Sequence, residues 1–174
     1  MKILIILGHP KSGSFCHAIA GTAMETLRAG GHDVIVHDLY AEAFDPVFPE
    51  GELLKGPAQA PAIRQQCDEL LAADGYVVVH PNWWAQPPAM LKGWVDRVVR
   101  QGVAYEFGPQ GAVIGHLAGK RGAAVLDAPW AALLDLPVGA HLDALRRAHT
   151  QGLIDLLVAG NVVDVSFPMI DGSR

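Results

Sequence analysis

Short apolar runs alternate with amphipathic segments along the chain, and this alternation predicts an α/β protein. A nearly uninterrupted apolar run is typical of a strand covered on both faces, whereas apolar residues three and four apart are typical of a helix. The predicted strands are residues 2–7, 33–39, 75–80, 122–126 and 162–167. The predicted helices are residues 15–29, 62–73, 88–101 and a stretch within 140–158. Strands that alternate with helices imply a parallel sheet with helices on both faces.

The boundaries of these elements carry suitable capping residues. Ser14 is a good N-cap for the first helix, and Pro88 can occupy the first position of the helix that follows it. Gly102 ends that helix, which has the clearest helical periodicity in the chain. The stretches 41–61 and 103–121 are rich in turn-forming residues and predict two long loops of the kind that often serve function.

Neither an internal repeat nor a linker divides the 174 residues, so a single domain spanning residues 1–174 is predicted. A hydrophobic content of 51% is ample for one core. After Phe167 the remaining residues are too few for a helix that would close the sheet. We therefore expect a partner subunit to cover one face of the last strand, or that face to be less well covered.

Charge and cysteine content narrow the class of protein. A formal net charge of -5 without a basic stripe argues against binding to nucleic acid or to a membrane surface. Only Cys16 and Cys67 are present, which gives no disulfide framework and indicates a reducing compartment, the cytoplasm. The eight histidines have no ligand-like spacing, so no metal site is predicted.

Three loops follow the carboxyl ends of predicted strands, where ligands bind in open parallel sheets. The first loop, residues 8–15, leads into a helix N-terminus, which favours phosphate. Its Gly8-x4-Gly13 spacing mimics a P-loop, but Ser14-Phe15 replaces the Lys-Ser/Thr pair, and the dinucleotide fingerprint lacks a glycine. Two interpretations stay open: a serine-rich turn for a single phosphate group, or serines that only cap a helix.

The second loop, residues 81–88, contains two adjacent tryptophans between prolines. A lone aromatic pair is ordinarily part of a core or an interface. At the carboxyl end of a strand, beside a phosphate-suited loop, Trp83 and Trp84 instead indicate a site for a planar ring. The prolines fix the backbone, so that its N–H groups can point towards a heterocycle.

Four segments together resemble a known family. They are His9-Pro10-x3-Ser14-Phe15, Phe44-Asp45-Pro46, Pro81-x-Trp83-Trp84-x2-Pro87-x-Ala89-x-Leu91-Lys92-Gly93-Trp94-x-Asp96-Arg97-Val98, and Gln101-Gly102-x-Ala104-Tyr105-x-Phe107-Gly108. From residue 2 to about residue 126 the chain resembles the flavodoxin-like NAD(P)H:quinone oxidoreductase family. The resemblance implies a flavodoxin-like three-layer sandwich with a five-stranded parallel sheet of strand order 2-1-3-4-5.

The same resemblance implies a bound flavin, FMN or alternatively FAD, and a homodimer. By position in the motifs, the flavin phosphates would be surrounded by His9, Ser14, Phe15 and Cys16. The isoalloxazine ring would be lined by Pro81, Asn82, Trp83 and Trp84, chiefly through backbone N–H groups, with Asp127 and Ala128 as further contacts. Tyr105 and Phe107 would close the active site of the partner subunit.

The implied reaction is a two-electron, ping-pong transfer of hydride from NAD(P)H through the flavin to a quinone or related acceptor. Other functions remain open: a nitro- or azo-reductase, a flavin-binding regulatory subunit of a potassium efflux antiporter, and a flavodoxin-type electron carrier.

The third loop departs from the family. Members usually carry Thr-Thr-Gly-Gly or Asn-Thr-Ser after the fourth strand, whereas this chain has Asp127-Ala128-Pro129-Trp130. Pro129 cannot donate a hydrogen bond, and a carboxylate beside a reduced flavin is electrostatically unfavourable. The sequence therefore predicts an altered flavin affinity or potential.

Several polar residues near these motifs have simpler interpretations. We expect His17 to face solvent, His80 to be half-buried, and Cys16 to be a small packed residue. Asp96 and Arg100 are predicted to form an exposed i, i+4 pair, and Arg97 to contribute to the dimer contact.

Overall fold

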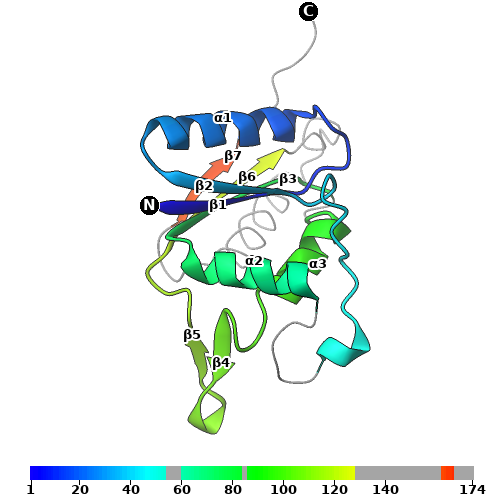
Figure 1. Ribbon diagram of the computed structural model, residues 1–174, viewed down its shortest axis with the longest axis vertical. Helices are drawn as coiled ribbons and strands as arrows, with labels where there is room; N and C mark the ends of the chain where they lie inside the picture. The colour runs from blue at the N-terminus through cyan, green and yellow to red at the C-terminus, as the bar shows by residue number, and fades with distance from the viewer. Residues whose placement is uncertain (54–59, 84–85, 128–161, 167–174) are drawn as a thin grey trace, which may run out of the picture.

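Within the described part of the chain, a five-stranded parallel sheet has α1 (Phe15–Ala29) on one face and α2 (Pro61–Ala72) and α3 (Ala89–Val98) on the other (Figure 1). The computed structural model describes residues 1–53, 60–83, 86–127 and 162–166. The sheet contains β1 (Lys2–Leu7), β2 (Asp33–Asp38), β3 (Gly75–Pro81), β6 (Arg121–Asp127) and β7 (Val162–Ser166). The short 3-10 turns are η1 (Glu50–Glu52) and η2 (Pro109–Gly111).

The strand order is β2-β1-β3-β6-β7, and every neighbouring pair is parallel. Because β6 and β7 are the fourth and fifth strands of this sheet along the chain, the predicted order 2-1-3-4-5 is confirmed. The helix predicted over residues 88–101 is shorter, since it ends at Val98 and Pro88 occupies the N-cap. The helix predicted within 140–158 and the absence of a closing helix after Phe167 lie outside the described residues.

The central strand β1 separates two apolar cores, because alternate side chains point to opposite faces. Ile3, Ile5 and Leu7 pack with α1, while Leu4 and Ile6 pack with α2 and α3. Among the described residues no helix is long and apolar enough to cross a membrane.

Gly93 explains how α3 and the loop after β2 come together. A Cβ atom at this position would lie 2.3 Å from the Cβ of Pro46 and 2.4 Å from its carbonyl oxygen. Only glycine therefore allows this approach, which links the Phe44-Asp45-Pro46 segment to the tryptophan-containing helix.

Below this contact, Glu52 of η1 forms a buried ion cluster with two arginines of the α3 region. Arg97 donates to Glu52 Oε1 at 3.0 Å and Arg100 donates to Glu52 Oε2 at 3.1 Å. The side chains of Arg97, Arg100 and Glu52 are only 4%, 7% and 1% exposed.

Two predictions for this helix are therefore wrong. Arg100 does not form an exposed pair with Asp96, which instead pairs with Lys92. Arg97 is buried within the subunit, where it binds Glu52 and Asp45, and is not a surface residue for a dimer contact. The spacing of Asp96 and Arg100 gave no sign of Glu52, which comes from a loop far away in sequence.

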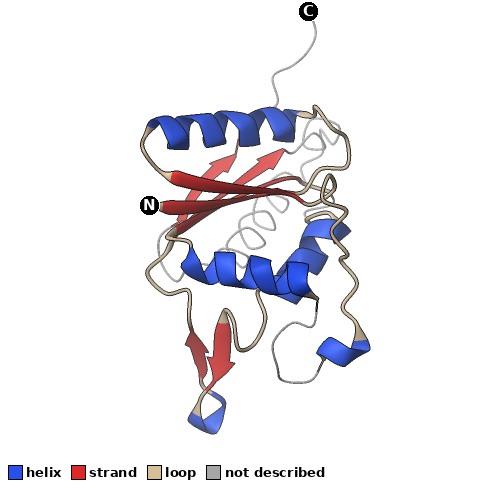
Figure 2. Cartoon of the chain, viewed as in Figure 1, coloured by secondary structure: helices blue, strands red, loops and turns tan. Residues whose placement is uncertain are grey.

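The stretch predicted as a loop over residues 103–121 contains an antiparallel hairpin. Its strands are β4 (Tyr105–Phe107) and β5 (Val113–Gly115), and it projects from the body of the molecule (Figure 2). The turn Gly108-Pro109-Gln110-Gly111 between aromatic and β-branched residues is a hairpin signal that could have predicted it.

Candidate functional site

The winding direction of the sheet reverses between β1 and β3, and two of the three sequence-predicted loops leave the sheet there. α1 connects β1 to one neighbour, whereas α2 crosses to the other side and leads into β3. Gly8 N–H donates to the carbonyl of Val79 at 2.9 Å, which joins the first loop to the end of β3. Such a switch point is where open α/β sheets bind ligands.

The first loop brings two imidazoles and a serine to the start of α1. The His9 Nδ1 accepts from the Lys11 N–H at 3.0 Å, which orders the loop, and the His9 and His17 rings meet edge to face at 6.2 Å. Gly13 has φ +69°, which a glycine adopts without strain. The result is a short turn whose half-buried donors lie beside a helix N-terminus.

Ser14 stands at the predicted N-cap, but its side chain makes no capping hydrogen bond. Its Oγ instead lies 2.8 Å from Nδ1 of His17, and Nε2 of His17 lies 3.1 Å from Oδ2 of Asp38. The expectation that His17 faces solvent is therefore wrong, because its side chain is only 20% exposed and is held from both ends. Sequence reasoning missed Asp38, which ends β2 and carries no local signal.

Phe15 and Cys16 lie at the same helix start but face different surroundings. Phe15 is 53% exposed, so its ring is accessible beside the loop. Cys16 is fully buried and packs with Leu7 and Val79 beneath α1. The prediction that Cys16 is a small packed residue is confirmed.

The second loop begins with a buried, ordered segment. His80 is 1% exposed, more buried than expected, and its Nδ1 lies 2.8 Å from the carbonyl of Pro81. Asn82 is also buried, whereas Trp83 is 37% exposed. Trp83 and Gln86 exchange backbone hydrogen bonds of 3.0 and 2.9 Å. The N–H of Trp83 is thus used within the loop, so this residue can offer a ligand its ring rather than its amide.

The third loop is described only at its beginning. Asp127 is the last residue of β6 and lies in register with Pro81, at the carboxyl edge of the sheet. Trp84 and Ala128 lie outside the described residues.

Tyr105 and Phe107 are not brought to these loops within one subunit. They lie on the hairpin between α3 and the start of β6, and Lys120 beyond it bonds to the carbonyls of Leu71 and Ala73 before β3. The hairpin therefore leaves from the amino ends of the strands, opposite the carboxyl-edge loops.

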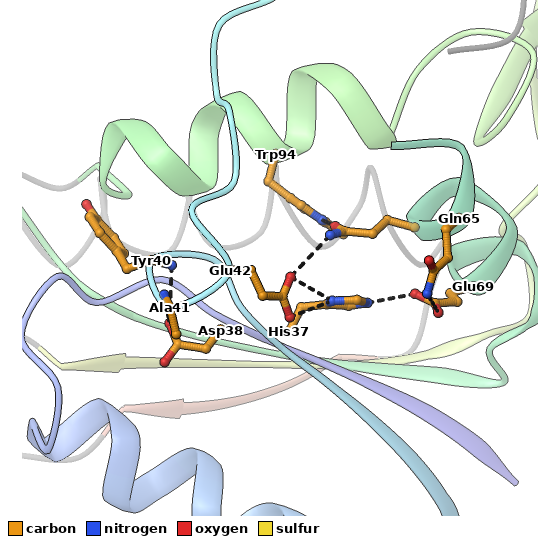
Figure 3. Close-up of polar contacts among 9 residues, drawn as sticks. His37, Asp38, Tyr40, Ala41, Glu42, Gln65, Glu69 and Trp94 are labelled. Atoms are coloured by element: carbon orange, nitrogen blue, oxygen red, sulfur yellow. Dashed lines mark hydrogen bonds and ion pairs between the residues drawn. The ribbon is translucent and has the colours of Figure 1, made fainter. Parts of the chain in front are cut away.

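A separate cavity of about 470 Å³ lies on the α2 face, beside a continuous polar network (Figure 3). In this network His37 bonds to Glu42 at 3.0 Å and to Glu69 at 2.7 Å, while Trp94 donates to Gln66 and Gln66 to Glu42. These polar side chains form their hydrogen bonds with one another. We therefore consider the carboxyl-edge loops at the switch point, where Phe15 and Trp83 are partly exposed, the better candidate site.

Known proteins resemble both the sequence and the architecture. A protein described as "Uncharacterized NAD(P)H oxidoreductase" from Haemophilus influenzae is 38% identical over 109 residues, which cover 61% of this chain and 54% of that protein. "NAD(P)H dehydrogenase [quinone] 1" from Rattus norvegicus is 30% identical over 125 residues, covering 61% of this chain and 46% of that protein. The chain thus matches about half the length of these relatives.

Solved structures extend the similarity. A putative quinone reductase from Klebsiella pneumoniae superposes with a TM-score of 0.81 at 27% identity, covering 100% of this chain and 78% of that one. An FMN-dependent NADH-azoreductase from Bacillus anthracis, in complex with FMN, has a TM-score of 0.68 at 16% identity, covers 95% of this chain and 85% of that one, and shares the fold alone.

A family described as "Flavodoxin-like fold" matches residues 1–128, which contain β1 to β6, the first loop (residues 8–15) and the second loop (residues 81–88). This match agrees with the observed strand order and with the position of the loops at the switch point. The chain therefore belongs to the flavodoxin-like family.

Proposed function

We propose that residues 1–174 form a single flavin-binding domain of an NAD(P)H-dependent oxidoreductase that reduces quinones. The observation that carries the proposal is the pairing, at one switch point, of a phosphate-suited loop with a proline-flanked tryptophan loop. Relatives named NAD(P)H oxidoreductase and NAD(P)H dehydrogenase [quinone] support the reaction class.

The first loop carries polar groups suited to a flavin phosphate. His9 and Ser14 bring a half-buried imidazole and hydroxyl to the start of α1, and the Ser14 side chain makes no capping hydrogen bond. A helix N-terminus adds a favourable partial positive charge for an anion. We assign His9 and Ser14 to the phosphate, with Phe15 as an exposed apolar neighbour and Cys16 acting only as packing beneath it.

The second loop suits the flat, largely apolar ring of a flavin. Pro81 and Asn82 form its buried floor, and Trp83 presents a partly exposed aromatic surface. Stacking on an aromatic ring and a rigid backbone are both means of holding a planar heterocycle without reorganisation. Trp84, Asp127 and Ala128 belong to the same proposal by their positions in the family motif.

FMN is the proposed cofactor, with FAD as the alternative. FMN occupies the azoreductase structure that shares this fold, and the phosphate-suited loop needs only one phosphate group to be filled. When bound, the flavin supplies the hydride transfer between NAD(P)H and the acceptor. The protein binds it, orients it and excludes water, and a single pocket used by both substrates predicts ping-pong kinetics.

The test is a steady-state assay of flavin-loaded protein with NADH or NADPH and a benzoquinone. We expect oxidation of the nicotinamide that depends on the quinone and shows parallel lines in double-reciprocal plots at several quinone concentrations. Protein loaded with flavin that turns over no quinone, nitro or azo acceptor would contradict the proposal.

A cytoplasmic homodimer completes the proposed site. On the hairpin, Phe107 is 54% exposed and meets the Tyr105 ring edge to face at 5.7 Å, while Val113 and Ile114 are 65% and 44% exposed. In a dimer this hairpin would reach the carboxyl-edge loops of the partner. Light scattering should therefore report a dimer, and Phe107→Asp should lower quinone turnover more than flavin content. A monomeric wild-type protein with full turnover would contradict this part.

A further inference from the structure

We propose that His17, anchored by Asp38, sets the hydroxyl of Ser14 towards the flavin phosphate, and that phosphate binding is coupled to uptake of a proton by His17. This inference rests on the proposed flavin-binding function. It gives a role to three residues that form one chain of hydrogen bonds from β2 to the start of α1: Ser14, His17 and Asp38.

Asp38 is fixed in position by the backbone that follows it. Its Oδ1 accepts hydrogen bonds from the N–H groups of Tyr40 at 3.2 Å and Ala41 at 3.1 Å (Figure 3). Its Oδ2 is the atom that faces Nε2 of His17 at 3.1 Å. The carboxylate is thus held by the turn on one oxygen and holds the imidazole with the other.

The direction of each hydrogen bond follows from the chemistry of the groups. A carboxylate only accepts, so Nε2 of His17 carries a hydrogen and donates it to Asp38. In a neutral imidazole Nδ1 is then an acceptor, and it takes the hydroxyl hydrogen of Ser14. In this state Ser14 offers only lone pairs to a ligand, and a phosphate oxygen also has only lone pairs.

Protonation of His17 reverses the bond to Ser14. Nδ1–H then donates to Oγ, and the hydroxyl hydrogen of Ser14 is released to bind a phosphate oxygen. The Asp38 carboxylate compensates the added positive charge at this half-buried position. Phosphate binding and proton uptake at His17 therefore favour each other.

Few other groups can take part in this coupling. Among the described residues the titratable groups that face His17 are Asp38 from β2 and His9 from the first loop, whose ring meets His17 edge to face. His9 already accepts the N–H of Lys11 at its Nδ1. The nitrogens of His17 are also in the opposite order to a serine-hydrolase triad, in which Nε2 faces the serine.

The experiment compares binding of FMN and riboflavin to the flavin-free protein by quenching of flavin fluorescence, as a function of pH. Riboflavin has the same ring and no phosphate, so the ratio of the two affinities isolates the phosphate contact. Above about pH 7 the FMN phosphate is already a dianion, so any further change there comes from the protein. We expect the FMN-to-riboflavin affinity ratio to fall as the pH rises through this range, with riboflavin affinity constant.

Two variants locate the proton. In Asp38→Asn the carbonyl oxygen can keep the turn, while the amide NH₂ donates to Nε2 and leaves Nδ1–H facing Ser14 in the neutral imidazole. Its affinity ratio should therefore lose its pH dependence. His17→Gln should lower the ratio about tenfold near neutral pH without changing riboflavin affinity. The matched controls Asp33→Asn and His32→Gln, at the other ends of β2 and α1, should behave like the wild type.

The outcomes separate this inference from the function on which it rests. If FMN binds but the affinity ratio of the wild type is independent of pH, or if Asp38→Asn keeps the wild-type slope, the proton coupling is wrong and the flavin site stands. If neither FMN nor riboflavin binds, the proposed function itself is wrong.

Discussion

His37 and Asp38 are consecutive residues of β2 that enter two different histidine–carboxylate networks on opposite faces of the sheet. On the α2 face His37 lies between Glu42 and Glu69, in a network that continues through Gln66 to Trp94 (Figure 3). On the α1 face Asp38 holds His17, and the chain of bonds ends at the hydroxyl of Ser14 beside the first loop.

The difference lies in how each network ends. The network on the α2 face joins buried His37, Gln66 and Trp94 to the carboxylates of Glu42 and Glu69, and its hydrogen bonds link β2 to α2 and α3, so its polar groups stabilise the packing of helix on sheet. The network on the α1 face ends at a half-buried serine at a helix N-terminus, which a ligand can reach. Similar residue types therefore serve stability in one place and binding in the other, and substitutions should separate the two roles.

The largest effect on stability is expected from the ion cluster on the α2 and α3 face. Glu52→Gln leaves Arg97 and Arg100 buried without a counter-charge and should lower the free energy of unfolding by about 3–5 kcal/mol. Glu50→Gln, an exposed neighbour, should change it by less than about 0.5 kcal/mol. Urea unfolding measures both, and equal effects of the two substitutions would contradict the assignment.

Trp94→Phe tests the polar network next to this cluster. The substitution removes the donor that bonds Gln66 Oε1 at 2.6 Å, so a buried acceptor loses its partner. The expected loss is about 1–3 kcal/mol in the free energy of unfolding. Trp83→Phe, at a partly exposed position, should cost less than about 0.5 kcal/mol in the same assay. If Trp83→Phe lowered the free energy of unfolding more than Trp94→Phe, the structural role assigned to Trp94 would be contradicted.

Acid should weaken the ion cluster. Burial alone raises the pKa of Glu52, but the hydrogen bond from Arg97 and the charges of Arg97 and Arg100 outweigh it and hold the pKa below its ordinary value of 4.5. A lowered folded-state pKa means that Glu52 contributes fully above pH 4.5 and loses its contribution as the pH falls through the folded value. The difference in unfolding free energy between wild type and Glu52→Gln should shrink in that range, and a constant difference would contradict it.

The smallest effect on stability is expected on the α1 face. Asp38→Asn keeps the turn at Tyr40 and Ala41 and affects a pair that is 20% and 25% exposed, so the cost should be under about 1 kcal/mol. The same substitution is expected to remove the proposed pH dependence of FMN binding. A stability loss as large as that of Glu52→Gln would make Asp38 a structural residue and remove the contrast between the faces.

The arrangement of strands could be predicted from the sequence because parallel strands buried on both faces read as apolar runs, and the alternation with helices fixes the architecture. The position of the candidate site follows from the same argument, since carboxyl ends of adjacent parallel strands meet at one edge, and it stays a prediction. The hairpin of Tyr105 and Phe107 was missed although its turn residues signal it.

Other features depend on partners that are far away in sequence. The spacing of Asp96 and Arg100 is that of an exposed pair on a helix. In the structure, Arg100 is buried because it binds Glu52 of η1, which precedes it by 48 residues in sequence. His17 and Asp38 come from different elements and meet only because α1 packs on β2. Local spacing contains no information about such contacts.

Hydrogen–deuterium exchange with and without FMN tests the central claim most directly, because it reports every backbone segment in the intact protein. The account predicts that FMN slows exchange in residues 8–18 and 80–83, at the ends of β1 and β3, and leaves α2 and η1 unchanged. Protection confined to α2 and the loop at residues 42–45, or no protection at any FMN concentration, would contradict a flavin site at this switch point.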